Sequence, residues 1–248
     1  MGIVDTHTHI NHGVPNDTKT SETYLSNLDE LYRIGSVAGI DRMFCSTFAS
    51  VLAPENVASE NEYMYELARS VDYLYQWMVI EPRTEETFKQ AKRMLCTKKC
   101  VGIKLHPQFH KYNYDEFGDK IFSIADEYGA VVLIHPWREA ELILPYADKY
   151  PNATFIMAHL SGASHVNAIE KARFGNVYTD VATAASTNNN VVEYAVNRIG
   201  SDRILFGTDT YAAGFIRGRI EYALISEKDK ENILINNAER LFERFLKP

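Results

Sequence analysis

The chain has 248 residues, 46% of them hydrophobic, which is enough to bury a sizeable core in one large domain. A net charge of −7 and a pI near 5.6 argue against nucleic acid or an anionic membrane as partner. No transmembrane-length apolar stretch and no leader before Ile3 are present, so we expect a soluble cytoplasmic protein. Three cysteines, an odd number, argue against a disulfide framework.

The first predicted strand, at residues 2–10, carries two histidines on one face. Side chains alternate between the faces of a strand, so Asp5, His7 and His9 point the same way. Neutral imidazole is the commonest metal ligand and suits zinc and similar ions. His-x-His alone is a weak pattern, and further ligands must come from later strands.

Strand and helix patterns alternate along the rest of the chain. The eight predicted strands are residues 2–10, 41–47, 73–80, 100–107, 130–136, 154–159, 176–182 and 203–209. The predicted helices are residues 21–34, 56–70, 84–97, 114–128, 139–149, 163–174 and 190–199, followed by a long amphipathic helix after the capping box at Ser226.

Eight βα units in this length predict a single domain, residues 1–248, folded as a (β/α)8 TIM barrel with an extra C-terminal helix. A doubly wound open sheet is the alternative. It requires a glycine-rich phosphate turn after the first strand, where this chain has His7-Thr8-His9.

Polar side chains gather at the predicted strand ends, where barrel enzymes place their active sites. They are His7, His9, Lys104, His106, His135, His159 and Asp209. Buried polar groups cost free energy unless they are matched, so this gathering predicts a metal site. The three remaining histidines, His12, His110 and His165, are predicted to lie at the surface.

Arginines predicted in loops over the barrel mouth are candidates for holding a substrate carboxylate. They are Arg83, Arg138 and Arg217. A guanidinium there can bind a carboxylate in a bidentate manner, although a surface salt bridge explains each one equally well.

Five segments and the tail resemble the amidohydrolase superfamily. They are residues 4–9 (VDTHTH), 102–107 (GIKLHP), 132–135 (VLIH), 158–162 (AHLSG) and 203–209 (RILFGTD), with the tail at residues 233–242. Within the superfamily they are most similar to the amidohydrolase-related branch that includes aminocarboxymuconate-semialdehyde and resorcylate decarboxylases. The resemblance spans nearly the whole chain.

The resemblance implies one divalent metal ion, Zn²⁺ with Mn²⁺ as the alternative, held by His7, His9, His135 and Asp209. A bound cation lowers the pKa of its water toward neutrality. Asp209 is then expected to accept that water's proton, and His159 to act as a general acid or base outside the ligand set.

Lys104 and His106 are expected to bind substrate, together with Arg138. Two alternatives remain open for Lys104. It is a structural lysine paired with Asp5 or another barrel carboxylate, or it is carboxylated and bridges two metals, as in binuclear members of the superfamily.

The sequence predicts a metal-dependent hydrolase acting on a small-molecule amide, ester or lactone. A metal-dependent decarboxylase of a small carboxylic acid is the alternative, and a non-catalytic binding protein is the third reading. We expect a small-molecule substrate, with a homodimer left open.

Overall fold

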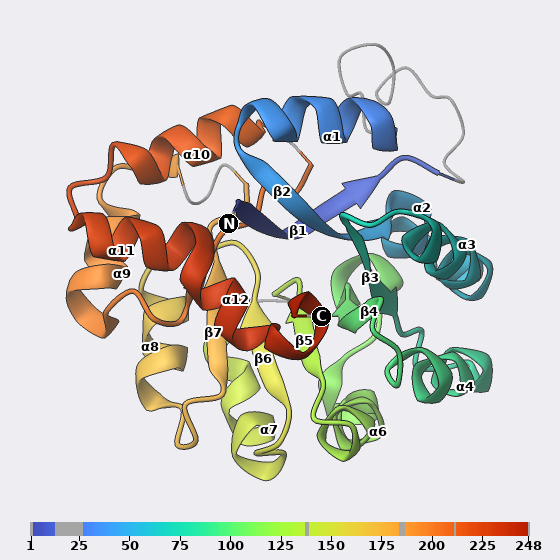
Figure 1. Cartoon of the computed structure of the whole chain (residues 1–248). Coiled ribbons are helices and arrows are strands. Elements are labelled where there is room, and N and C mark those ends of the chain that lie inside the picture. The colour runs from blue at the N-terminus through green and yellow to red at the C-terminus, as the bar shows by residue number, and fades with distance from the viewer. Residues whose placement is uncertain (1, 13–26, 137–138, 184–186, 211, 248) are drawn as a thin grey trace.

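The structure, a computed structural model, describes residues 2–12, 27–136, 139–183, 187–210 and 212–247, and its eight strands form one parallel sheet that curves into a barrel (Figure 1). The strands pair in chain order from β1 to β8. They are β1 Ile3–Ile10, β2 Ile40–Thr47, β3 Leu74–Val79, β4 Cys100–Leu105, β5 Val131–Ile134, β6 Thr154–Met157, β7 Val177–Asp180 and β8 Ile204–Leu205.

Hydrogen bonds between the chain after β8 and β1 bring the two edges of the sheet together. The amide of Thr6 donates to the carbonyl of Phe206 at 3.0 Å, and the amide of Thr208 donates to the carbonyl of His7 at 3.1 Å. The predicted (β/α)8 barrel is therefore confirmed.

Helices surround the barrel, and one or more of them follow each strand. They are α1 Leu28–Val37, α2 Phe48–Leu52, α3 Val57–Ser70, α4 Glu85–Met94, α5 Pro107–His110, α6 Tyr114–Glu127, α7 Leu144–Lys149, α8 Ala163–Lys171, α9 Val191–Ile199, α10 Ala213–Glu221, α11 Glu227–Glu231, α12 Asn237–Leu241 and α13 Glu243–Leu246. Within the described residues, no helix combines the length and apolar character that crossing a bilayer requires.

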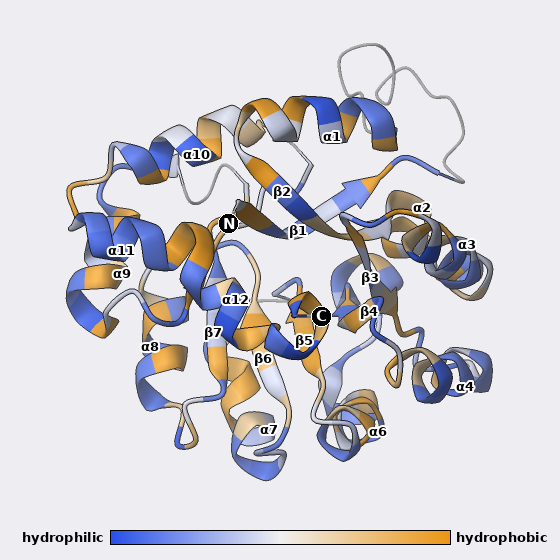
Figure 2. Ribbon diagram, in the orientation of Figure 1, coloured by the Kyte–Doolittle hydropathy of each residue, from blue (hydrophilic) through white to orange (hydrophobic). Residues whose placement is uncertain are grey.

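The core has one layer inside the barrel and one between the strands and the helices. Figure 2 shows strands rich in hydrophobic residues, surrounded by helices that carry both hydrophobic and hydrophilic residues. Apolar side chains of the strands, such as Phe44 and Trp77, fill the barrel, and Phe242 of the C-terminal segment packs against them. Gly102 of β4 permits this packing. A Cβ there would lie 2.1 Å from the carbonyl oxygen of Val131 and 2.6 Å from the Trp77 ring.

The predicted C-terminal helix is present, with a π-helical stretch at Asn232–Asn236 between α11 and α12. Two other expectations about the chain's outer parts are wrong. His110 and His165 are buried, not solvated. The Nε2 of each ring hydrogen-bonds to a backbone carbonyl, that of Ser50 for His110 and that of Ala158 for His165, which satisfies one nitrogen of each buried ring. The start of the first predicted helix, residues 21–26, lies outside the described residues.

Candidate metal centre

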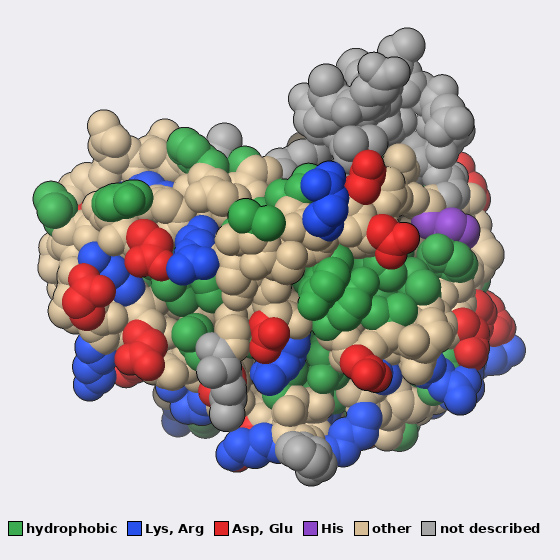
Figure 3. Space-filling model, turned by 45° about the horizontal axis from the view of Figure 1, so that its top comes forward, with side chains coloured by type: hydrophobic (Ala, Val, Ile, Leu, Met, Phe, Trp, Pro, Cys, Tyr) green, Lys and Arg blue, Asp and Glu red, His purple; other side chains and the backbone are tan. Residues whose placement is uncertain are grey.

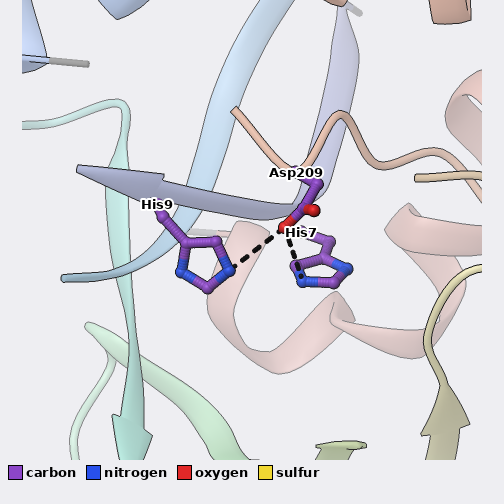
Figure 4. A group of neighbouring side chains, drawn as sticks. All are labelled: His7, His9 and Asp209. Atoms are coloured by element: carbon purple, nitrogen blue, oxygen red, sulfur yellow. Dashed lines mark ion pairs between the residues drawn. The ribbon is translucent and has the colours of Figure 1, made fainter. Parts of the chain in front are cut away.

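His7 and His9 of β1 meet Asp209, which follows β8, at the C-terminal end of the barrel (Figure 4). The Oδ1 of Asp209 lies 3.4 Å from Nε2 of His7 and 3.2 Å from Nε2 of His9. Two ligands about 2.1 Å from one tetrahedral or octahedral ion are about 3.0–3.4 Å apart. Both distances to Asp209 therefore match the spacing that a single divalent ion requires, and the three donor atoms all lie within 4.8 Å of one another.

The other ring nitrogen of each histidine hydrogen-bonds to a side chain on the side away from Asp209. Nδ1 of His7 lies 2.9 Å from Oδ2 of Asp180, and Nδ1 of His9 lies 2.8 Å from Oγ of Ser46. A carboxylate only accepts, so Nδ1 of His7 carries the proton and Nε2 carries the lone pair. Burial lowers the pKa of both histidines, which keeps them neutral and able to ligate.

Asp180 ends β7 and was not singled out in the sequence. It is fully buried, and its Oδ1 also accepts the amides of His159 and Ala182, each at 3.0 Å. Burial alone would raise its pKa, but the electrostatic interaction and hydrogen bond with His7 outweigh that effect and lower it. Its position at a strand end, like that of the histidines, was the available signal.

Lys104 reaches the same centre from β4, where its hydrogen-bond partner is His7 and not Asp5. Its Nζ donates to Nε2 of His7 at 2.7 Å, whereas Asp5 accepts from Oγ1 of Thr208 at 2.6 Å. Burial lowers the pKa of Lys104 to about 8. The amine and a metal ion therefore compete for one lone pair.

His135 and His159 form a pair beside this centre. Nδ1 of His159 lies 3.4 Å from the carbonyl oxygen of Ala182, which only accepts, so that nitrogen is the protonated one. Nε2 of His159 then accepts from Nδ1 of His135 at 3.0 Å, which leaves a lone pair on Nε2 of His135. Burial lowers the pKa of His159 to about 4 and that of His135 to about 3, so both rings are neutral at pH 7.

The predicted ligands are thus only partly brought together. Among the described residues, two groups of mutually close ligand atoms occur, His7–His9–Asp209 and His7–His159–Asp180. The second is held by the hydrogen bond between His7 and Asp180, so it is a supporting network. His135 belongs to neither group, and its free Nε2 is the atom that could join the first.

His106 caps the short helix α5 and forms part of the wall. Its Nδ1 accepts the amide of Phe109 at 3.3 Å, so its neutral ring carries the proton on Nε2. The ring stacks between those of Phe109 and His135, with centroids 4.3 and 4.0 Å away. His106 therefore offers a hydrogen-bond donor at Nε2.

The arginines predicted to bind substrate are engaged or lie elsewhere. Arg83 follows β3 and donates to Glu81 and to the carbonyl of His110. Arg217, expected over the mouth, lies on α10 and donates to the carbonyl of Ala38, just before β2, at the opposite end of the barrel. Arg138 lies outside the described residues.

Two residues of the centre hold left-handed backbone conformations. The φ angles are +66° at His159 and +53° at Asp209, values that non-glycine residues rarely adopt. Such strain is common at functional sites, where the surrounding structure maintains it.

Fold and centre define a (β/α)8 protein with a histidine–aspartate cluster at the mouth of its barrel. The sequence profile described as Amidohydrolase matches residues 4–244. The chain therefore belongs to the amidohydrolase family. No curated protein sequence matches it in a direct comparison.

Solved structures of decarboxylases share the fold. The 2,6-dihydroxybenzoate decarboxylase from Rhizobium is 17% identical, with a TM-score of 0.77 over 98% of this chain and 99% of that one. A dihydroxybenzoic acid decarboxylase from Polaromonas sp. JS666, with bound manganese and 2-nitroresorcinol, is 18% identical, with a TM-score of 0.75 over 98% and 97%. The 5-carboxyvanillate decarboxylase from Sphingomonas paucimobilis is 13% identical, with a TM-score of 0.77 over 98% and 99%.

Proposed function

We propose that the protein is a metal-dependent decarboxylase of a small aromatic carboxylic acid. The observation that carries the proposal is the convergence of His7, His9 and Asp209 on one ion-sized space, in a fold shared with three decarboxylases. Hydrolysis was the first expectation from the sequence. The structural relatives favour its alternative.

The proposed cofactor is one divalent ion with His7, His9, His135 and Asp209 as ligands. The donor set consists of neutral imidazoles and one ionised carboxylate. Burial would raise the pKa of Asp209, but the interactions with His9 and His7 outweigh that effect and lower it, so the carboxylate is ionised. Such a set suits Zn²⁺ and Mn²⁺ alike, and the manganese in a relative supports the second. When bound, the ion polarises a substrate oxygen as a Lewis acid.

The residues around this centre match an aromatic acid. The protonated Nε2 of His106 and the amine of Lys104 are donors for a carboxylate or hydroxyl group. The rings of Phe48 and Phe109 provide apolar faces against which a substrate ring can stack. The centroid of the Phe48 ring lies 5.1 Å from that of the His9 ring.

His159 is the group to which we assign proton transfer. Decarboxylation breaks the bond between the ring carbon and the carboxylate, releases CO2 and leaves a carbon that must gain a proton. The neutral Nε2 of His159 can take a proton from a substrate hydroxyl and return it to that carbon, once the hydrogen bond from His135 is displaced.

Hydrolysis is the second candidate, because the matching family profile is described as Amidohydrolase. In that reaction the ionised Asp209, adjacent to the ion, would accept a proton from the attacking water. The same ligands serve both reactions, so the product must decide between them.

The deciding experiment screens hydroxybenzoic acids beside esters, lactones and amides with metal-loaded protein in oxygen-18 water. Expected is CO2 release from an aromatic acid, with no solvent oxygen in the aromatic product. Metal-stripped protein and the His159→Asn variant are the matched controls, and elemental analysis reports the ion. Solvent oxygen in the product of an ester, lactone or amide, without CO2 release from any acid, would overturn the proposal in favour of hydrolysis.

A further inference from the structure

Helices α1 and α10 border a groove of about 470 Å³ on the outside of the barrel. It is lined by Arg33, Ile34, Val37, Ala38, Gly214 and Arg217. Ala38 directly precedes β2, so the groove extends toward the N-terminal ends of the strands, away from the histidine–aspartate cluster. It is therefore separate from the proposed active site.

Exposed apolar side chains concentrate on these two helices and the turn after α10. Five of the ten large hydrophobic residues that the described chain exposes are there: Ile34, Val37, Phe215, Tyr222 and Leu224, exposed by 45, 87, 60, 87 and 91%. In Figure 3, which turns this side toward the viewer, hydrophobic side chains lie at the upper left among largely uncharged surface. With about 150–250 Å² per aromatic side chain, these five expose on the order of 600 Å².

The charged residues of α10 are neutralised within the chain. Arg217 pairs with Glu221 and donates to the carbonyl of Ala38, and Arg219 pairs with Glu193. On α1, Arg33 of the groove lies one turn after Asp29 and Glu30, so the face carries charges of both signs and no strong charge of one sign that would select an oppositely charged partner. It can meet a copy of itself without repulsion between these groups.

The outer surface of α10 permits close approach of another helix. Gly214 and Gly218 lie one turn apart, and a Cβ at either position would meet no heavy atom within 4 Å. Exposed side chains, Phe215 and Tyr222, flank them. Small residues spaced in this way let two helix backbones cross closely, and the crossing of identical helices is self-complementary.

We propose that this face is the interface of a homodimer, in which α1 and α10 of one copy pack on α1 and α10 of the other around a two-fold axis. A standard interface buries about 800 Å² per partner, which the apolar residues nearly supply before any polar rim is counted. An aromatic side chain of the second copy, Phe215 or Tyr222, enters the groove beside Val37.

The first test measures the mass of the full chain in solution by light scattering and sedimentation. The wild type is expected at twice the chain mass of 28.2 kDa. The double variant Val37→Glu/Phe215→Glu is expected to weaken the dimer roughly a hundredfold, because it places unpaired charges in the interface. Leu142→Glu, at a residue 52% exposed on another part of the surface, is the matched control and leaves the dimer intact.

A second test does not depend on the folding of charged variants. Gly214→Cys and Gly218→Cys, each combined with Cys96→Ser to remove the exposed native thiol, are exposed to oxidised glutathione. At least one is expected to form a disulfide-linked dimer across the axis. A monomeric wild type overturns the proposal. A dimer also overturns it if neither cysteine variant forms a cross-link and the double glutamate variant remains dimeric.

Discussion

Replacing Asp180 with Asn tests whether the proposed ion site depends on the tautomer of His7. The two oxygens of Asp180 accept from Nδ1 of His7 and from the amides of His159 and Ala182. An amide accepts at only one of these positions. If its oxygen keeps the backbone bonds, its NH2 group faces the protonated Nδ1, and His7 relieves the conflict by moving its proton to Nε2.

Two magnitudes follow from this geometry. Loss of the carboxylate behind a ligating histidine weakens metal binding about 10- to 100-fold, or about 1.4–2.7 kcal/mol. The substitution also removes a buried hydrogen bond to a charged group, which lowers the free energy of unfolding by about 1.5–3 kcal/mol. Both effects arise at a residue that would not touch the ion.

Metal affinity is measured by competition with a chelator, and stability by urea unfolding of the metal-free protein. Asp202→Asn is the matched control, because the carboxylate of Asp202 accepts a 3.3 Å hydrogen bond from Asn232, at the other end of the barrel. If Asp180→Asn binds metal as tightly as the wild type while His9→Ala loses it, the role assigned to Asp180 is refuted.

Three further predictions concern proton transfer and packing. His159→Asn keeps its metal, since His159 is placed outside the ligand set, but loses about two to four orders of magnitude in turnover; loss of metal on elemental analysis would make His159 a ligand. In the metal-free wild type the folded pKa of His159, about 4, lies below its ordinary 6.5, so folding stability falls as pH drops from 6.5 toward 4. Urea unfolding should therefore show the wild type losing about 2 kcal/mol more than His159→Asn between pH 7 and pH 5, and equal losses would contradict this. Gly102→Ala destabilises by about 1–3 kcal/mol because its Cβ meets the Val131 carbonyl, whereas Gly35→Ala, whose nearest contact is 3.5 Å, is tolerated; equal melting temperatures would disprove the clash.

Much of the fold could be predicted because its signals are local. Apolar runs such as residues 130–134 and turns such as Gly129 depend on near neighbours in the chain, and eight repeats of one βα unit leave few topologies. The shared end of parallel strands also explains why His7, His9 and Asp209 could be grouped before any coordinates were known. Their ligand role and that of His135 remain predictions.

The tertiary structure alone decided which groups touch. The contact between His7 and Asp180 spans 173 residues, and that between Lys104 and His7 spans 97, so no local pattern contains either. His110 resembled a surface residue in the sequence because its burial depends on packing against helix α2, which follows β2. Arg217 resembled a mouth residue because only the course of α10 reveals which end of the barrel it reaches. The periodicity of a chain determines its elements, whereas the protonation and partners of side chains depend on distances that arise only when strands far apart in sequence lie side by side.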